Sequence, residues 1–315
     1  MWDVHAHVIP PAVLEAARAG LYGLALEGDW LLVDGGRILV RNMSNIGSLT
    51  RYATDFHLSL LLSVPPLLIR DVESSRGDWF RFLNDALSQL CQALTVESAM
   101  LAALPLAESG LALKEWDRVQ GVAWGLTLGT GIQQEIFTKG RFRPFWDGFA
   151  ASGGGMAFIH GGPGQDPRLG DYYLDNLVGY PAEDTLAAAA LVFSGLPVRY
   201  PDIQWCLSHG GGSAAFLVGR WQRGYETKRP GIDTALPSPM ETFGVLWFDS
   251  VVHDDRSLAL LMDRAPGRVV FGTDYPFPMG TQHQLSDGSV PAHIFRALEA
   301  NGQRLIQSVR KGRST

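Results

Sequence analysis

The feature that most constrains the fold is the regular alternation of short apolar segments with segments of helical periodicity. The apolar segments are expected to be strands, at residues 2–4, 58–64, 100–104, 123–128, 156–159, 203–207, 245–248 and 269–271. Helices are expected between them, at residues 79–94, 111–119, 144–151, 182–193, 214–223, 258–262 and 292–309. Strands that alternate with helices form parallel sheets. Eight such units predict a closed (β/α)8 barrel of the TIM type.

A small insertion follows the first predicted strand. Residues 34–37 read DGGR and lie between two further apolar segments, at 31–33 and 38–40. Glycine supplies the positive φ of a tight turn, so a β-hairpin is expected within residues 24–40. The alternative fold is a doubly wound open sheet, which would need a glycine-rich dinucleotide loop that residues 3–11 do not contain. Residues 1–315 are interpreted as one barrel domain, because no low-complexity linker interrupts them.

Composition and charge argue against several classes of protein. The chain is 46% hydrophobic and has a net charge of −6 with no basic run, so neither nucleic acid nor an anionic membrane is an expected partner. The most apolar stretches, at 58–69 and 186–198, are too short or too interrupted to span a bilayer. Two cysteines, Cys91 and Cys206, cannot form a disulfide framework or a cysteine-rich zinc site. A cytoplasmic protein without a signal peptide is expected.

Two histidines near the N-terminus suggest a metal site. Residues 3–7 read DVHAH, and side chains alternate between the faces of a strand, so His5 and His7 should lie on the same side. Two imidazoles placed in this way can hold one metal ion, because histidine is the commonest protein metal ligand. The alternative is a pair of solvated histidines at a frayed terminus.

Three further polar residues, His160, His209 and Asp274, follow predicted strands. The carboxyl ends of all barrel strands open onto one face, where active sites lie. We therefore expect these three residues to converge with His5 and His7. Three histidines and one carboxylate would make a mononuclear metal site with room for water, and a fourth histidine would remain for acid–base chemistry.

Each of these three residues taken alone also allows a simpler interpretation. His160 could be a core histidine, and Asp274 could be a turn carboxylate close to a proline. His209 is more specific, because the three glycines that follow it permit close packing and a sharp turn. The other histidines do not end predicted strands, and of these only His253 is interpreted as a rim residue: His57, His253, His283 and His293.

Several segments together resemble the metal-dependent amidohydrolase superfamily: residues 3–7, 158–160 (FIH), 207–212 (LSHGGG) and 272–278 (GTDYPFP). Within it, the chain is most similar to the aminocarboxymuconate-semialdehyde decarboxylases and related decarboxylases, and residues 177–183 (LVGYPAE) and 218–220 (VGR) add to that match. The resemblance covers nearly the whole chain and is densest from residue 160 to residue 279.

The resemblance implies one divalent metal ion, usually zinc, held with a bound water by His5, His7, His160 and Asp274. Ligands of this kind would also accept manganese or cobalt. His209 would be the catalytic acid–base residue, acting beside Asp274. Members of this branch decarboxylate conjugated or aromatic carboxylic acids without an organic cofactor.

The resemblance also implies that arginines bind the substrate carboxylates, and the candidates are Arg51 and Arg220. Arg220 should lie roughly 16 Å beyond His209 along a helix, too far to reach back into its own site. Either it caps its helix, or, as in related decarboxylases, it enters the pocket of the partner in a homodimer. Gly161 and Asn176 stand where the family usually has proline and often has tryptophan, which leaves the substrate open.

The sequence therefore favours a metal-dependent, non-oxidative decarboxylase of an unsaturated or aromatic acid such as aminocarboxymuconate semialdehyde. The alternative is a metal-dependent hydrolase or hydratase that acts on a related ring-cleavage product, because a fold does not fix a reaction. A third hypothesis is an inactive barrel with a binding or assembly role. The presence of all four candidate ligands and of His209 argues against it.

Overall fold

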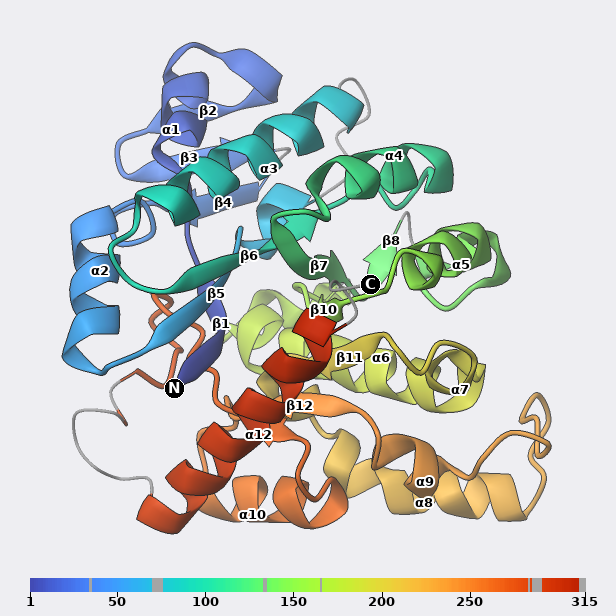
Figure 1. The fold of residues 1–315 in the computed structure, drawn as a ribbon. Helices are drawn as coiled ribbons and strands as arrows, with labels where there is room; N and C mark the ends of the chain where they lie inside the picture. Colours follow the sequence, from blue (N-terminus) through green and yellow to red (C-terminus); the bar gives the residue numbers. More distant parts are fainter. Residues whose placement is uncertain are drawn as a thin grey trace.

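Eight parallel strands follow one another around the centre of the molecule in the order of the chain (Figure 1). The structure is a computed structural model, which describes residues 1–33, 36–69, 76–132, 135–164, 166–282, 284 and 291–311. The strands are β1 (Trp2–His7), β5 (Ser59–Ser63), β6 (Ser98–Ala103), β7 (Ala123–Gly129), β10 (Met156–His160), β11 (Gln204–Leu207), β12 (Trp247–Asp249) and β13 (Val269–Val270). Each of them overlaps one of the eight predicted strands.

Backbone hydrogen bonds close the sheet into a barrel. The amide of Val4 in β1 donates to the carbonyl of Phe271, 3.0 Å away, just after β13. The amide of His7 likewise donates to the carbonyl of Tyr275 at 2.7 Å. In the opposite direction, the amide of Asp274 donates to the carbonyl of His5 at 2.8 Å. The first and last strands are thus joined, which confirms the predicted (β/α)8 barrel and excludes an open sheet.

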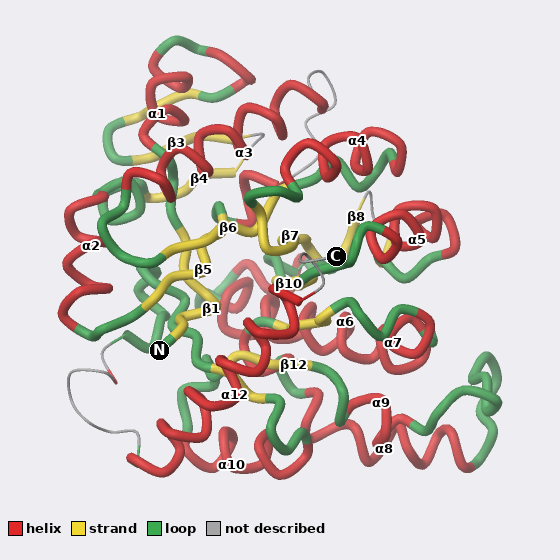
Figure 2. The backbone as a smooth tube through the Cα atoms, viewed as in Figure 1, coloured by secondary structure: helices red, strands yellow, loops and turns green. Residues whose placement is uncertain are grey.

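Helices surround the barrel (Figure 2). They are α1 (Pro11–Arg18), α2 (Ile46–Asp55), α3 (Arg76–Ala93), α4 (Ser109–Val119), α5 (Arg143–Ala151), α6 (Tyr180–Ser194), α7 (Leu196–Arg199), α8 (Ala214–Glu226), α9 (Pro239–Phe243), α10 (Asp255–Arg264) and α12 (Ala292–Lys311). All seven predicted helices are present. None of the helices that the structure describes combines the length and the apolar character needed to cross a membrane.

Helix α2 was not predicted. It begins after Asn45, whose side chain accepts a hydrogen bond from the amide of Ser48 at 2.9 Å. Its buried side chains are only Leu49, Tyr52 and Ala53. This short apolar stripe is a weak periodic signal, but the asparagine cap marks the start of the helix.

The insertion after β1 is a three-stranded antiparallel sheet of β2 (Ala25–Glu27), β3 (Trp30–Val33) and β4 (Gly36–Leu39). The predicted hairpin is present as β3 and β4, and β2 adds a third strand that was not predicted. Turn residues 34 and 35 lie outside the described residues. A second small hairpin, β8 (Gly131–Ile132) and β9 (Glu135–Ile136), follows β7.

Helix α12 packs across the amino-terminal end of the barrel (Figure 1). Its side chains Leu305, Ile306 and Val309 join the cluster inside the barrel that includes Val4 and Phe158. This packing buries the amino-terminal ends of the strands. A site that binds a ligand must therefore open at the opposite end, where the strands finish.

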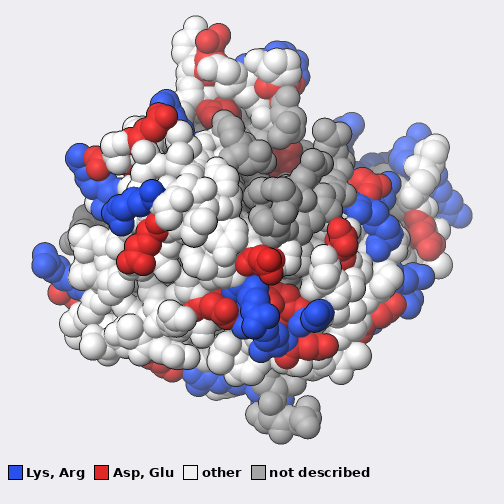
Figure 3. Space-filling model, turned by 90° about the horizontal axis from the view of Figure 1, so that it is seen from above, with Lys and Arg blue, Asp and Glu red and all other residues white. Residues whose placement is uncertain are grey.

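Charged side chains of both signs are interspersed among the described residues on the face shown in Figure 3. The net charge of −6 agrees with this distribution.

Candidate metal centre

Five polar side chains meet at the carboxyl-terminal end of the barrel. His5 and His7 come from β1, His160 ends β10, His209 follows β11, and Asp274 follows β13. One possible ligand atom from each of His5, His160, His209 and Asp274 lies within 4.8 Å of the others. The Nε2 atoms of His5 and His7 are 3.0 Å apart, and each is 3.1 Å from Oδ1 of Asp274. His5, His160, His209 and Asp274 can thus hold a metal ion, and the cluster with His7 contains every strand-end residue that the sequence singled out.

The hydrogen bonds of two histidines suit them to bind a cation. Nδ1 of His5 lies 2.5 Å from Oδ2 of Asp249, and Nδ1 of His160 lies 2.6 Å from the carbonyl oxygen of Gly161. Carboxylate and carbonyl oxygens accept hydrogen bonds, so these contacts place a proton on Nδ1 of each ring. In the neutral form of each ring, which is the form that binds a metal ion, Nε2 then carries the lone pair. That of His160 is buried with no hydrogen-bond partner among the described residues. Such a nitrogen fits a metal ion.

Electrostatics favour a positive charge at this point. Burial alone would lower the pKa of His5, but Asp274 and Asp249 overcome burial and raise it to about 9. Burial opposes ionisation of Asp274, yet His5 and the hydrogen-bonding histidines hold its pKa well below the usual range. Burial and neighbouring histidines lower the pKa of His160, which keeps its ring neutral. The carboxylate of Asp274 is thus ionised, and the centre attracts a proton or a metal ion.

His209 differs from the other histidines in its partners. Its Nδ1 lies 2.7 Å from Oδ2 of Asp184, a fully buried carboxylate on α6. Oδ1 of Asp184 accepts hydrogen bonds from the hydroxyl of Ser208 and the amide of Gly161, at 2.9 and 2.7 Å. Burial would lower the pKa of His209, but Asp184 and then Asp274 raise it well above the ordinary value. His209 can therefore hold a proton on Nε2, which faces Asp274 at 3.8 Å.

Two more buried carboxylates fix the backbone around the centre. Asp249 accepts hydrogen bonds from the amides of Gly210 and Val251, at 2.9 and 3.1 Å, in addition to its contact with His5. Asp3 accepts hydrogen bonds from the hydroxyl groups of Tyr52 and Thr273, at 2.8 and 2.6 Å. Asp3 therefore ties β1 to the segment that carries Asp274.

Sequence reasoning gave no role to Asp184, Asp249 or Asp3. The only signal for Asp184 was a charged residue within an otherwise apolar, alanine-rich helix. Asp249 was visible as a residue at the end of a predicted strand, and Asp3 as the residue two positions before His5. Which atoms these carboxylates contact depends on residues that are distant in the sequence.

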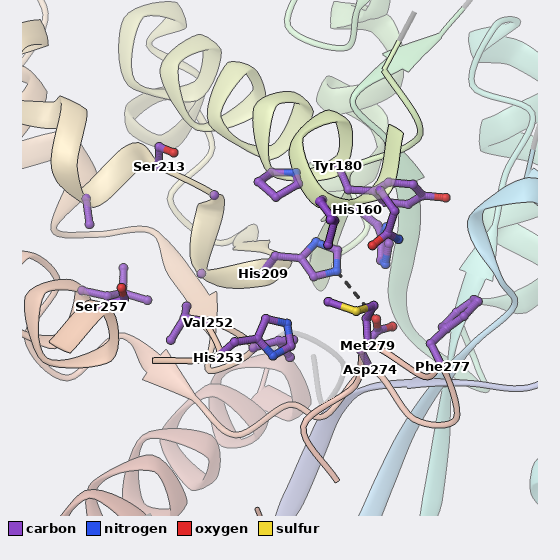
Figure 4. Close-up of a pocket in the computed structure, with 18 of the residues that line it drawn as sticks. His160, Tyr180, His209, Ser213, Val252, His253, Ser257, Asp274, Phe277 and Met279 are labelled. Atoms are coloured by element: carbon purple, nitrogen blue, oxygen red, sulfur yellow. Dashed lines mark ion pairs between the residues drawn. The ribbon is translucent and has the colours of Figure 1, made fainter. Parts of the chain in front are cut away.

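A cavity of about 500 Å³ lies over the centre, and His160, His209 and Asp274 line it together with Asn176 and His253. Figure 4 shows His209 facing Asp274 across this space. Much of the remaining wall is apolar and includes Val251, Val252, Leu260, Leu261, Phe277 and Met279. A pocket with a few polar groups and a mainly apolar wall is typical of small-molecule sites.

The two candidate arginines lie outside this cavity. Arg51 is exposed on α2 and Arg220 is exposed on α8, and neither is among the residues that line the cavity. No lysine or arginine lines the cavity within the described part of the chain. The structure thus brings together the five metal-centre residues within one chain but not the two arginines.

Two proteins that resemble this chain in sequence are named decarboxylases. The chain is 31% identical over 235 residues to a 2-amino-3-carboxymuconate-6-semialdehyde decarboxylase of Dictyostelium discoideum, a match that covers 73% of the chain but less than two thirds, 64%, of that relative. It is 26% identical to a 6-methylsalicylic acid decarboxylase of Penicillium expansum, with 87% of the chain and 84% of the relative covered.

A solved structure shares the fold of this chain, and a family model matches its sequence. The crystal structure of the 5-carboxyvanillate decarboxylase LigW from Sphingomonas paucimobilis superposes with a TM-score of 0.79 at 20% identity, covering 98% of each chain. That likeness supports the fold. The model of the amidohydrolase family matches residues 2–292. With its barrel and its strand-end histidines and carboxylate, this chain belongs to the amidohydrolase family.

Proposed function

We propose that this protein is a metal-dependent, non-oxidative decarboxylase of an aromatic or unsaturated carboxylic acid. The observation that carries the proposal is the position of His209, which is bonded to buried Asp184 and faces the metal centre inside a cavity. An acid–base group beside a metal ion is what carbon–carbon cleavage with proton return requires. The names of the two relatives support the same reaction class.

We assign the metal ligands to His5, His7, His160 and Asp274, with His209 left for proton transfer. The 3.0 and 3.1 Å contacts among His5, His7 and Asp274 support this choice, because His209 is further from Asp274, at 3.8 Å. Nitrogen and oxygen ligands without a thiolate suit zinc, and also manganese or cobalt. When bound, such an ion supplies Lewis-acid stabilisation of a substrate oxygen.

The protein's own residues then have distinct tasks. Asp184 holds the Nδ1–H of His209, so that Nε2 points into the cavity. As the bond between the substrate carbon and its carboxylate breaks, CO2 leaves and the electron pair stays on that carbon. His209 delivers the proton from Nε2 to the same carbon. His160 and Asp274 are nearly inaccessible to solvent, which strengthens the electrostatic interactions between them and His209.

We also propose a homodimer in which Arg220 binds the substrate carboxylate in the partner's cavity. Its exposure on α8, outside the cavity of its own chain, supports this role. The planar guanidinium suits the task because it can bind a carboxylate with two parallel hydrogen bonds. Arg51, which is exposed on α2, is the second candidate for this contact.

The proposed reaction is tested with metal-loaded protein and a panel of muconate-like and hydroxybenzoate-like acids. The expected result is release of CO2 in step with a change in ultraviolet absorption. A product that gains water and keeps its carboxylate would support the hydrolase or hydratase alternative instead. Metal-loaded protein that changes none of the acids would contradict the proposal.

A further inference from the structure

Asp274, which we assign as a metal ligand, has an uncommon backbone conformation. Its φ is +57°, in the left-handed region that residues with a side chain rarely occupy. A conformation of this kind persists only where the surrounding structure holds it in place. The contacts of the two flanking residues, Thr273 and Tyr275, therefore decide how firmly the Asp274 carboxylate is presented to the metal centre.

One side chain from a helix outside the barrel contacts both of these flanking residues. Tyr52 lies on α2, and its exposed fraction is only 7%. Its hydroxyl oxygen is 2.9 Å from Oγ1 of Thr273. Its ring stacks on the ring of Tyr275, with the centroids 4.2 Å apart and the planes 8° from parallel. Tyr52 thus contacts the residue before Asp274 and the residue after it.

The carboxylate of Asp3 connects the same hydroxyl to β1. Oδ2 of Asp3 accepts hydrogen bonds from the hydroxyls of Tyr52 and Thr273, at 2.8 and 2.6 Å. Oδ1 accepts hydrogen bonds from the amides of His5 and Thr273, each at 3.1 Å. Because Asp3 is fully buried, bulk water cannot replace a donor that is removed, and the loss of one is costly. The Tyr52 hydroxyl is therefore part of the connection between the two strands that carry metal ligands.

We propose that Tyr52 is a positioning residue, which raises the affinity of the centre for its metal ion by holding the segment around Asp274 against β1. The hydroxyl acts through Asp3 and Thr273, and the ring acts through Tyr275. Tyr52 is not among the residues that line the cavity, so it acts on the ion only through these contacts. The inference rests on the proposed role of Asp274 as a metal ligand and is independent of the reaction that follows.

Removal of the Tyr52 hydroxyl should weaken metal binding. Tyr52→Phe keeps the ring that stacks on Tyr275 but leaves Asp3 with one donor fewer. The dissociation constant for zinc should rise by about tenfold or more, because loss of a group that orients a metal ligand typically costs about 10–100-fold in affinity. It is measured on the metal-free full chain by competition with a chelating dye. Tyr52→Leu also removes the stacked ring and should raise the constant further.

Tyr275→Phe is the matched control, because it removes the other hydroxyl of the same stacked pair. That hydroxyl is not one of the two that donate to Asp3, so zinc affinity should stay at the wild-type value. All affinities are measured at a temperature at which circular dichroism shows the proteins to be folded, so that a loss of global stability does not contribute. Wild-type zinc affinity in folded Tyr52→Phe would overturn the inference.

Hydrogen exchange on the wild-type protein gives a second test, which does not require a variant to fold. If Tyr52 raises metal affinity, the metal must in turn stabilise the contacts of Tyr52, because coupling free energies are reciprocal. Zinc should therefore slow amide exchange in α2 by about tenfold. Helix α4, which is of similar length and carries no residue of the metal centre or of the cavity wall, should respond less.

Equal effects of zinc on the two helices would contradict the coupling between Tyr52 and the metal centre. A wild-type protein that binds no zinc, manganese or cobalt would refute the metal centre itself, and this inference with it. Protein that binds the metal but releases CO2 from no acid would refute only the proposed reaction. In that case the affinities of Tyr52→Phe and Tyr275→Phe would still decide whether Tyr52 positions the metal ligand.

Discussion

Oδ2 of Asp184 lies 2.7 Å from Nδ1 of His209, and this contact joins helix α6 to the loop after β11. The carboxylate is fully buried, and its other oxygen accepts two further hydrogen bonds. Asp184 is therefore rigidly held. It fixes the orientation and the proton position of His209 without reaching the cavity, which makes it a positioning residue.

Replacement of Asp184 by asparagine should lower kcat by about 10²–10⁴-fold, the range for loss of general acid–base catalysis. KM and metal content should change little, because Asp184 contacts neither the cavity nor the ligand atoms. The measurements are steady-state kinetics and elemental analysis. Glu183→Gln is the matched control, since the carboxylate of Glu183 accepts a hydrogen bond from Thr130 instead. Loss of metal in Asp184→Asn would mean that Asp184 supports the centre itself.

The roles of His209 and His160 can be separated in the same way. His209→Asn should keep its metal and lose about 10²–10⁴-fold in kcat, whereas His160→Asn should lose both metal and activity. Elemental analysis beside an assay of CO2 release distinguishes the two. If His209→Asn were the variant without metal, His209 would be a ligand, and the proton donor would have to be sought elsewhere.

Purified protein should contain about one divalent ion per chain, as expected for a mononuclear site of three histidines and one carboxylate. A chelator should abolish activity and lower the melting temperature, because an ion that binds only the folded state stabilises it. Addition of zinc, manganese or cobalt should restore both, and the ion that restores the native values identifies the metal. A chelated protein with full activity would rule out a metal-dependent reaction.

The proposed homodimer, in which Arg220 of one chain binds the substrate in the cavity of its partner, predicts complementation between inactive variants. Arg220→Ala and His209→Asn should each be nearly inactive alone. When they are mixed and allowed to exchange subunits, about a quarter of the wild-type activity should return, because one site in each mixed dimer holds both native residues. An active monomer in light scattering, or mixed variants without recovery, would leave Arg220 as an exposed residue in the middle of α8, too far from the end of this helix to cap it as the sequence alternative expected.

The two thiols should be inert in the folded protein. Burial raises the pKa of Cys91 to about 12 and also raises that of Cys206 well above its ordinary value. Both are then neutral thiols at pH 8, and only the thiolate is a strong nucleophile. Ellman's reagent should find no rapidly reacting thiol in native protein and two after denaturation in urea. Fast reaction of a native thiol would show that local opening exposes it.

The sequence alone determined the barrel and the convergence of its five polar strand-end residues. Strands and helices are recognised from local periodicity, and parallel strands with helical connections leave few topologies open. Once the barrel is assumed, residues that end strands must share one face, as His5, His160 and Asp274 do here. No knowledge of side-chain packing is needed for that step.

Only the tertiary structure decided which groups hold these residues in place. Asp184 is 25 residues from His209, and Asp249 is 244 residues from His5, so neither contact follows from local pattern. Both depend on how helices and strands pack, as does the exposure of Arg51 and Arg220 outside the cavity. Local periodicity fixes the type of each element, whereas the partners of a buried carboxylate are fixed by contacts between distant elements.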